Sequence, residues 1–223
     1  MGILSPNSFK KDENAIHYSA LHSKNLLMVF TRNPVLGKCK TRLAAAIGDK
    51  AALAIYNHLL EHTFSITKNV TAHKQVYYSD EIWENDIWDS GIFEKRLQQG
   101  NDLGDRMANA FRHGFEQGYK NIIVIGSDMY DLDTPDLQNA FSTLQNHNFV
   151  IGPAVDGGYY LLGMNSFKDS LFQNKKWGKE TVLADSLKDL EGEDLHLFEA
   201  RNDIDQLEDI EHIEALQPYL KNI

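Results

Sequence analysis

The stretch NIIVIGSD, residues 121–128, decides how this chain is expected to fold. Four apolar residues follow one another from Ile122 to Ile125 without a polar break. A continuous run of this length, rich in β-branched side chains, is typical of a strand that is buried on both faces in a parallel sheet. Gly126 closes the run, and Ser127 and Asp128 come directly after it. We therefore expect a central strand whose carboxyl end carries an acidic group.

The segments on either side of this strand alternate between strand-like and helix-like patterns. Further strands are predicted over residues 26–30, 74–80, 93–98, 149–153 and 159–164. Helices are predicted over residues 44–68, 81–90, 103–118, 134–146 and 180–190. Strands that are regularly separated by helices predict an α/β fold of three layers, α/β/α, around a mostly parallel central sheet.

The length and composition are those of an ordinary globular protein. With 223 residues the chain can bury a core without disulfides, and we expect one domain over residues 25–223 after a polar tail over residues 1–24. The net charge of −10 argues against a general nucleic-acid binder, which needs a broad basic face. The apolar runs are too short to span a membrane, and no secretory signal is recognised. The single cysteine, Cys39, fits a reducing cytoplasm and is interpreted as a small packing residue.

A basic loop follows the first predicted strand. Its candidate phosphate-binding residues are Arg32, Gly37, Lys38, Lys40 and Arg42. Ligands of such folds bind outside the carboxyl ends of the strands, where fixed positive charge and free backbone N–H groups suit a phosphate or diphosphate. A solvated loop is the alternative, and acidic groups at a second strand end favour the phosphate site.

The segment GSDMYDLD, residues 126–133, supplies those acidic groups. Asp128, Asp131 and Asp133 would repel one another unless a cation neutralises them. Carboxylate oxygens suit Mg²⁺ or Mn²⁺, which prefer one or two carboxylates together with substrate phosphates. Asp133 precedes a proline and is interpreted as the cap of the helix over residues 134–146. Asp128 is thus the predicted metal ligand, and Asp131 stays open between the two roles.

Two further segments lie at predicted strand ends. In QQGNDLGDRM, residues 98–107, the amide of Gln99 suits a nucleobase edge and Gly100 permits close approach, although Gln99 could instead end the strand and face solvent. Arg106 lies in the first turn of a helix, where a cation is unfavourable unless it meets a phosphate or a nearby aspartate. The turn from Asp156 to Tyr159 suits either a hairpin or the edge of a binding site.

Four blocks together resemble one family: FTRNPVLGKCKTRL, QQGNDLGDRM, IGSDMYDLD and GPAVDGGYYLLG. This is the family labelled arsenosugar biosynthesis glycosyltransferase, or radical-SAM/selenodomain-associated transferase. It is similar to the phospholactate and molybdenum cofactor guanylyltransferases. The resemblance runs from about residue 26 to residue 220, including Trp177 and the closing segment NDIDQLEDI. It implies a nucleotide-diphospho-sugar transferase fold, which is glycosyltransferase-A-like and Rossmann-like.

The resemblance also implies roles for single residues. Arg32, Lys38, Lys40 and Arg42 would hold the nucleotide phosphates, Gln99 and Gly100 would meet the base, and Asp128 would bind the metal. Asp156 would lie beside the sugar or a second metal and is the candidate base of an inverting transfer, although inversion and retention both stay open. Gly157, Gly158, Tyr159 and Trp177 would line the sugar or acceptor side.

Two positions depart from the family pattern. Tyr130 stands where proline is usual, and Gln206 and Leu207 stand where Thr-Pro is usual. Tyr130 is expected either to reshape the acceptor side or to mark a weakened enzyme. The favoured function is a metal-dependent glycosyltransferase that moves a sugar from a nucleotide sugar to a small acceptor. The alternatives are a nucleotidyltransferase that joins a nucleoside triphosphate to a phosphorylated small molecule, and a non-catalytic nucleotide-binding module.

Overall fold

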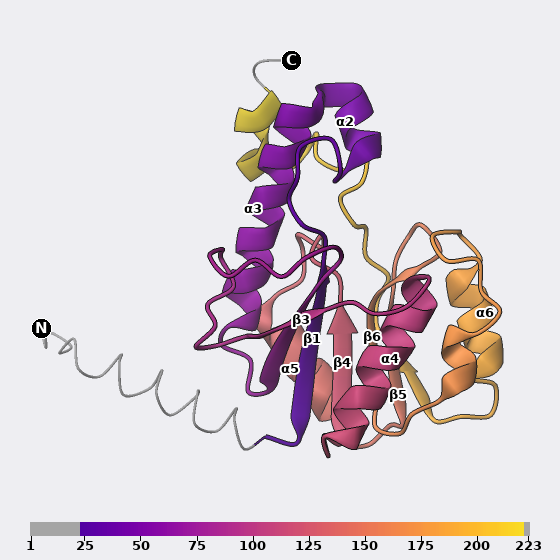
Figure 1. Ribbon diagram of the computed structural model, residues 1–223. Helices are drawn as coiled ribbons and strands as arrows, with labels where there is room; N and C mark the ends of the chain where they lie inside the picture. The colour runs from indigo at the N-terminus through magenta and orange to yellow at the C-terminus, as the bar shows by residue number, and fades with distance from the viewer. Residues whose placement is uncertain (1–22, 221–223) are drawn as a thin grey trace, which may run out of the picture.

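A seven-stranded sheet forms the centre of the computed structural model, which describes residues 23–220 (Figure 1). The strands are β1 (Asn25–Thr31), β2 (His73–Tyr78), β3 (Glu94–Leu97), β4 (Asn121–Ile125), β5 (Phe149–Pro153), β6 (Tyr159–Met164) and β7 (Leu195–Leu197). The helices are α2 (Thr41–Ile47), α3 (Asp49–Thr67), α4 (Leu103–Glu116), α5 (Thr134–Thr143) and α6 (Val182–Asp189), with the 3-10 helices η1 (Asp169–Phe172) and η2 (Glu214–Leu220). The tail predicted over residues 1–24 lies outside the described residues except for its last two.

The sheet is mostly parallel, as predicted. Its strand order is β3-β2-β1-β4-β6-β5-β7. β1 pairs in parallel with β2 and β4, and β3 and β7 also run parallel to their partners. Within the described sheet only β6 runs against its neighbours, β4 and β5. The carboxyl ends of β1, β2 and β4 therefore lie side by side at one edge of the sheet, on the side of α2 (Figure 1). This edge is called the carboxyl edge below.

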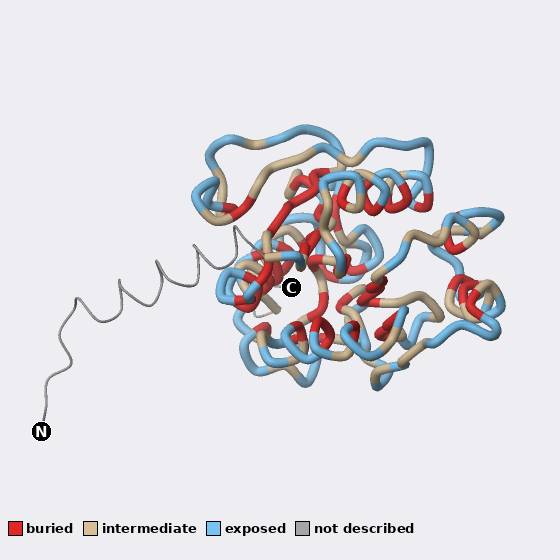
Figure 2. Tube along the Cα trace, turned by 90° about the horizontal axis from the view of Figure 1, so that it is seen from below, coloured by how far each residue is buried: buried red, intermediate tan, exposed pale blue. Residues whose placement is uncertain are grey.

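The central strands are apolar because both of their faces are covered. On β1, Leu27 and Val29 belong to a core shared with α3 and α5, whereas Leu26 and Met28 belong to a core shared with α4 and the region of η1. These residues alternate between the two cores because successive side chains of a strand point to opposite faces of the sheet. Buried positions accordingly run through the interior of the trace, and the exposed ones lie on its outer turns (Figure 2). The predicted three-layer arrangement is confirmed.

The single helix predicted over residues 44–68 is wrong, because the chain forms two helices there. α2 ends and α3 begins at Gly48, whose φ of 84° lies in the left-handed region. Glycine adopts this conformation without a Cβ penalty, so the chain turns sharply between the helices. Leu43 and Ile47 of α2 then pack with Ile55 of α3 in a third cluster, which also contains Leu216 of η2. This cluster attaches the C-terminal segment to the helices that follow β1.

The short helix predicted over residues 81–90 is also wrong, and these residues form bends and turns. The carboxylate of Asp86 accepts hydrogen bonds from the backbone N–H of Trp88 at 3.0 Å and from Lys95 Nζ at 2.8 Å. Lys95 Nζ also donates to the backbone carbonyls of Trp83 and Glu84. Such side-chain bonds occupy the backbone groups that a helix would use. Within this segment Ile82 is 41% exposed, whereas Trp88 is buried.

The other predicted elements lie close to their expected positions. β5 and β6 have the predicted bounds, α4 and α5 end two and three residues early, and α6 is shorter at both ends. β7, η1 and η2 were not predicted, because a strand of three residues and 3-10 helices of four and seven residues give too little periodicity to detect. None of the helices within residues 23–220 is both long and apolar enough to cross a membrane.

Candidate functional site

Lys40 and Asp128 form an ion pair at the carboxyl edge. Lys40 Nζ lies 2.9 Å from Asp128 Oδ2. Asp128 follows β4, and Lys40 lies in the loop between β1 and α2, so the ends of two neighbouring strands contribute one residue each. The side chain of Lys40 is only 7% exposed, whereas that of Asp128 is 39% exposed. The basic loop and the acidic segment predicted from the sequence therefore meet in one place.

The loop holds Lys40 in an unusual backbone conformation. Its φ of 47° and ψ of 48° are left-handed, and a residue other than glycine adopts this region at a cost of roughly 1–2 kcal/mol. The residue before it, Cys39, is buried, and burial raises the pKa of its thiol despite the nearby charges of Lys40 and Arg32. Cys39 Sγ donates to the carbonyl of Val35 at 3.6 Å. Cys39 therefore anchors the loop by packing, as the sequence indicated.

Three buried hydroxyl groups join the ends of β1 and β4 to α3. Tyr56 of α3 has its hydroxyl oxygen 3.2 Å from both Thr31 Oγ1 and Ser127 Oγ, and Ser127 Oγ donates to Thr31 Oγ1 at 3.1 Å. The backbone N–H of Arg32 donates to the same Tyr56 oxygen at 2.9 Å. A polar network whose members are all satisfied makes a buried region rigid. These bonds fix the two strand ends from which Arg32 and Asp128 project.

The C-terminal segment brings a second carboxylate, Asp203, to the same edge. This segment runs beside the end of β5, where the N–H of Val155 donates to the carbonyl of Arg201 at 2.9 Å and the N–H of Arg201 donates to Pro153 at 3.0 Å. The N–H of Ile204 then donates to the carbonyl of Asp128 at 3.3 Å. Asp203 is thereby held beside Asp128.

The charges at this edge act on one another. Burial, with the charges of Asp128 and Asp156, raises the pKa of Asp203 to about 6, although Lys40 acts in the opposite direction. Burial by itself would lower the pKa of Lys40, but Asp128, Asp203 and Asp205 raise it above its ordinary value. The edge therefore holds one buried ammonium group among several carboxylates.

Sequence reasoning missed Asp203 as a site residue. The closing segment NDIDQLEDI was noted only as part of a resemblance, although it contains Asp203 and Asp205 two positions apart. That pairing was the available signal. Local sequence gives no reason to place it at the carboxyl edge, because the return beside β5 depends on tertiary contacts of Arg201 and Ile204.

The other predicted phosphate-binding residues differ from Lys40 in their exposure. Arg32, Gly37 and Lys38 are exposed in the loop. Arg42, in the first turn of α2, is 66% exposed and pairs with Asp205 at 2.8 Å. The basic loop thus presents one buried, paired lysine and several exposed cations at the carboxyl edge.

The turn after β5 is a hairpin turn that also supports the next segment. Asp156 is exposed, and its Oδ1 accepts from the N–H of Gly158 at 2.9 Å. Gly157 has a φ of 88°, and a Cβ there would lie 2.1 Å from the carbonyl oxygen of Glu180. The carbonyl of Gly157 also accepts from the N–H of Leu183 at 2.8 Å. Gly157 is therefore needed where the start of α6 docks on the turn, and Asp156 stays free to face the carboxyl edge.

Tyr159 and Trp177, both predicted for the acceptor side, pack against each other. Their ring centroids are 6.5 Å apart and the rings are nearly perpendicular. The Tyr159 hydroxyl lies 4.0 Å from Met107 Sδ, and burial raises its pKa. A Cβ on Gly104, at the start of α4, would lie 2.2 Å from Trp177 Nε1. The pair thus closes the space between the hairpin turn and α4.

The segment before α4 places Gln98 and Gln99 differently. Gln98 Nε2 donates to the carbonyls of Thr31 and Tyr77 at 3.2 and 3.0 Å, so its amide joins the ends of β1 and β2. Gln99 is exposed, and within residues 23–220 its side-chain amide has no hydrogen bond, while its carbonyl accepts from Asn109 at 2.8 Å. Gln99 is therefore available to a ligand.

Gly100 and Arg106 have partners within the protein. A Cβ on Gly100 would lie 2.6 Å from the Cβ of Asp105, so this glycine permits the close approach of the loop to α4. Arg106 Nε donates to the carbonyl of Gly100, and Arg106 Nη1 donates to Gln98 Oε1, both at 3.3 Å. The cation in the first turn of α4 is thus balanced by neutral oxygens rather than by Asp102 or Asp105.

Asp133 and Asp131, the other aspartates of the segment 126–133, have different surroundings. Asp133 caps α5, because its side chain accepts from the N–H of Asp136 in a capping box, which confirms that prediction. Asp131 is exposed, and its backbone carbonyl accepts a hydrogen bond from Arg201 Nη1 at 2.8 Å, so the backbone of Asp131 contacts the C-terminal segment.

The Tyr130 ring lies 5.2 Å from the His62 ring and 6.0 Å from the His58 ring, both on α3. Tyr130 therefore packs on α3 rather than beside Tyr159.

Asp128 and Asp203 are two carboxylates that could hold a divalent cation at the carboxyl edge. Within residues 23–220 no group of three or more His, Cys, Asp or Glu side chains is arranged to hold a metal. Two carboxylates are enough for Mg²⁺, which takes one or two of them with water and substrate phosphates. The pKa of Asp203 is raised mainly by burial and further by the charge of Asp128.

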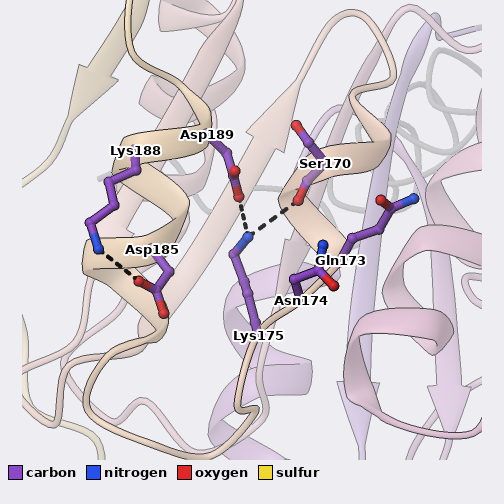
Figure 3. Close-up of a pocket in the computed structure, with 7 residues that line it drawn as sticks. All are labelled: Ser170, Gln173, Asn174, Lys175, Asp185, Lys188 and Asp189. Carbon is purple, nitrogen blue, oxygen red and sulfur yellow. Dashed lines mark hydrogen bonds and ion pairs between the residues drawn. The ribbon is translucent and has the colours of Figure 1, made fainter.

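A cavity between η1 and α6 is lined by none of these residues (Figure 3). It encloses about 250 Å³ and is lined by Ser170, Gln173, Asn174, Lys175, Asp185, Lys188 and Asp189. Lys175 pairs with Asp189 and donates to the carbonyl of Ser170, and Lys188 pairs with Asp185 at 3.0 Å. The charges of Lys175 and Lys188 in this cavity therefore already have partners within the protein.

Comparison with known proteins agrees with the fold. A family model described as "Uncharacterized protein conserved in bacteria (DUF2064)" matches residues 63–179. No curated protein sequence matches the chain.

Solved structures match over most of the chain. A protein from Desulfovibrio desulfuricans G20, described as a "putative nucleotide-diphospho-sugar transferase", is 29% identical, with 82% of this chain and 83% of that chain covered and a TM-score of 0.77. A cytidylyltransferase from Leptospira borgpetersenii is 13% identical, with 82% and 79% covered and a TM-score of 0.52. A 4-diphosphocytidyl-2C-methyl-D-erythritol synthase from Anaerococcus prevotii is 9% identical, with 86% and 95% covered and a TM-score of 0.55. The fold is that of the nucleotide-diphospho-sugar transferases.

Proposed function

This chain belongs to the DUF2064 family and has a nucleotide-diphospho-sugar transferase fold, and we propose that it is a metal-dependent transferase that moves a sugar from a nucleotide sugar to a small-molecule acceptor. The observation that carries the proposal is the meeting of Lys40, Asp128 and Asp203 at the carboxyl edge. A cation next to two carboxylates at the switch point of a parallel sheet suits a diphosphate with its metal. The resemblance to radical-SAM/selenodomain-associated transferases supports a small acceptor.

The phosphate side of the proposed site is built from the basic loop. Lys40 is fixed by burial, and Arg32 and Lys38 are exposed at the same edge. Arg42 would add a further charge if it left Asp205, its present partner at 2.8 Å. When the sugar leaves the diphosphate, negative charge grows on the phosphate oxygens, and cations fixed beforehand stabilise it without reorganising.

The carboxylates would hold the metal. Asp128 and Asp203 are the proposed ligands, and Asp131 belongs to the proposed set only if its loop turns toward them. Bound Mg²⁺ or Mn²⁺ would supply additional positive charge to the leaving diphosphate. Coordination requires Asp203 in its ionised form, and its pKa of about 6 restricts that form to higher pH than for an ordinary aspartate.

The hairpin turn supplies the acceptor side of the proposed site. Asp156 is exposed and close enough to Asp203 to raise its pKa, so it lies where a carboxylate could take the proton of an acceptor hydroxyl. Gly157 and Gly158 allow the backbone of this turn to pack closely against its neighbours. Tyr159 and Trp177 form the apolar wall of the acceptor side. Gln99 and the adjoining Gly100 are assigned to the nucleobase, because the Gln99 amide is exposed and makes no bond within the described residues.

A nucleotidyltransferase is the second candidate. The pair of Lys40 and Asp128 would serve a nucleoside triphosphate as well as a nucleotide sugar, because both reactions stabilise phosphate oxygens. The 29% identical structure, described as a nucleotide-diphospho-sugar transferase, favours the sugar transfer. A non-catalytic nucleotide-binding module is the third candidate. It was suggested by Tyr130, whose ring packs against His62 of α3 at 5.2 Å.

The test begins with a thermal-shift screen of nucleotides and nucleotide sugars, each with and without Mn²⁺. A ligand at a hundred times its dissociation constant should stabilise the fold by about 2.7 kcal/mol. The stabilising ligand is then incubated with candidate acceptors. Release of a nucleoside diphosphate from a nucleotide sugar supports the glycosyltransferase, and pyrophosphate release from a nucleoside triphosphate supports the alternative. Nucleotide binding that Mn²⁺ does not strengthen, with no turnover of any donor, would contradict both.

A further inference from the structure

The ligand-free site already contains a cation at Asp128, and that cation is Lys40. Lys40 Nζ contacts Asp128 Oδ2 at 2.9 Å, and Asp128 Oδ2 is one of the oxygens that a metal would need. Lys40 therefore already satisfies the carboxylate that would bind the metal.

Lys40 is held in this position more firmly than the other cations of the loop. Its side chain is 7% exposed, whereas that of Arg42 is 66% exposed and Lys38 is also exposed. Its backbone is fixed in the left-handed region between buried Cys39 and the start of α2. A buried lysine in a fixed loop keeps its place without a ligand, which an exposed lysine does not.

A divalent metal at Asp128 would compete with Lys40 for the same carboxylate, because the metal and the nearby ammonium group repel each other. A diphosphate removes this conflict, because its oxygens give Lys40 a new partner and give the metal further ligands. The metal and the nucleotide should therefore depend on each other for binding.

We propose that Lys40 occupies the cation position at Asp128 in the ligand-free protein, so that the divalent metal binds only together with the nucleotide, whose phosphate then takes over Lys40. This inference rests on the proposed nucleotide-dependent function. It makes Lys40 a positioning residue that has two partners one after the other, first Asp128 and then the phosphate. It also sets a binding order that the charges of the loop alone would not require.

The experiment measures Mn²⁺ binding by calorimetry without nucleotide and with UDP, GDP, CDP or ADP. The variants are Lys40→Met, Lys40→Met with Asp128→Asn, and Lys50→Met as a matched lysine at an exposed position. Wild type and Lys50→Met should bind Mn²⁺ weakly until the nucleotide is present. Lys40→Met should bind Mn²⁺ alone at least about tenfold more tightly than wild type, and the added Asp128→Asn should remove that gain. Lys40→Gln repeats the measurement if Lys40→Met does not fold.

Three results decide between the inference and the function on which it rests. A tenfold gain in Lys40→Met that Asp128→Asn removes supports the inference. Equal Mn²⁺ affinity of wild type and Lys40→Met without nucleotide overturns it, while Mn²⁺-dependent nucleotide binding would leave the proposed function standing. Failure of Mn²⁺ to bind any variant, even with a nucleotide that itself binds, overturns both the inference and the metal dependence of the proposed function.

Discussion

The two ends of the sheet each bury a lysine, and the two lysines differ in their surroundings. Lys40, at the carboxyl edge, pairs with Asp128 at 2.9 Å, and nearby carboxylates raise its pKa. Lys74 lies near the start of β2, at the opposite end, where its Nζ donates to the carbonyl of Ala72 at 3.1 Å. Burial lowers the pKa of Lys74 to about 8.

This difference separates a lysine of a site from a lysine of the core. Lys74 has no carboxylate partner within residues 23–220, so burying its charge lowers the stability of the fold. Its surroundings do not indicate a ligand site. At the carboxyl edge Lys40 is paired with Asp128, and Asp203 keeps a raised pKa because it is buried near other carboxylates. A paired lysine at one end of the sheet, and a lysine without a carboxylate partner at the other, predict opposite responses to mutation.

The largest effect is expected from removing the charge of Asp128. Asp128→Asn keeps the shape of the side chain but removes the ligand charge, so metal-dependent turnover should fall about a hundredfold or more. Steady-state kinetics with saturating Mn²⁺ measure it. Asp133→Asn is the matched control, because asparagine is itself a good helix cap and the change should leave activity within about twofold. Greater damage from Asp133→Asn would mean that ligand and cap have been exchanged.

The next effect compares Lys40 with Arg42. Lys40→Ala should weaken nucleotide binding by roughly ten- to a hundredfold, since a fixed and desolvated cation binds phosphate more strongly than a solvated one. Arg42→Ala should weaken it less than about threefold, because Arg42 is exposed and already pairs with Asp205. Calorimetric titration of the nucleotide in the presence of Mn²⁺ measures both.

Equal losses in the two variants would show that the loop acts through its total charge, and that burial of Lys40 is incidental. The comparison also bears on the alternative of a solvated loop. The side chain of Lys40 is only 7% exposed, so it is not a solvated cation. Thermal melting of Lys40→Ala should therefore be measured beside its affinity.

The opposite end of the sheet predicts a gain in stability. Lys74→Met removes a buried charge and should raise the free energy of unfolding by about 1–2 kcal/mol at pH 7, after loss of the bond to Ala72. The folded pKa of Lys74, about 8, lies below its ordinary value of 10.5, so wild type recovers this free energy as the pH rises from 8 to 10.5. The advantage of the variant should thus be full below pH 8 and vanish above about pH 10.5.

Urea unfolding at pH 7 and pH 10 measures this change. Lys68→Met, at the exposed end of α3, is the control and should change stability by no more than about 0.5 kcal/mol at either pH. An advantage of Lys74→Met that does not shrink at pH 10 would show that the lysine charge is not its cause. The prediction concerns folding alone, so nucleotide affinity should stay at the wild-type value.

The sequence predicted the fold well wherever one local pattern determines an element. The apolar run of β4 and the bounds of β5 and β6 follow from burial and turn residues within the segment itself. The prediction failed over residues 81–90, because the contacts of Asp86 with Lys95 come from a strand farther along the chain. Gly48 carries a signal for the helix break that was overlooked, since a glycine within a helical pattern often ends a helix.

The candidate site was predicted to a similar extent. The strand-end rule brought the loop of Lys40 and the segment of Asp128 together, and the structure places them in contact. Asp203 was not predicted, because its place at the carboxyl edge depends on hydrogen bonds of a long C-terminal segment to β5 and to the Asp128 carbonyl. Such long-range contacts leave no periodicity in the sequence.

The smallest effect is expected at Gln99, which lies at the carboxyl edge without a charge. Its side chain is exposed and unbonded within the described residues, whereas the amide of Gln98 joins β1 and β2. Gln98→Ala should therefore lower the free energy of unfolding by about 1 kcal/mol. Gln99→Ala should leave stability unchanged and reduce the preference among uridine, guanosine and adenosine nucleotides by about three- to fivefold, because an amide that pairs with a base rejects a mismatched one.

Competition titrations among UDP, GDP and ADP, with Mn²⁺ held constant, measure the preference of the Gln99 variant. Total affinity should change much less than the preference, since the phosphates and the fixed charge of Lys40 supply most of the binding free energy. If the base preference survives Gln99→Ala unchanged, Gln99 only ends the segment before α4. Recognition of the base would then fall to backbone groups beside Gly100, where a side chain would collide with Asp105.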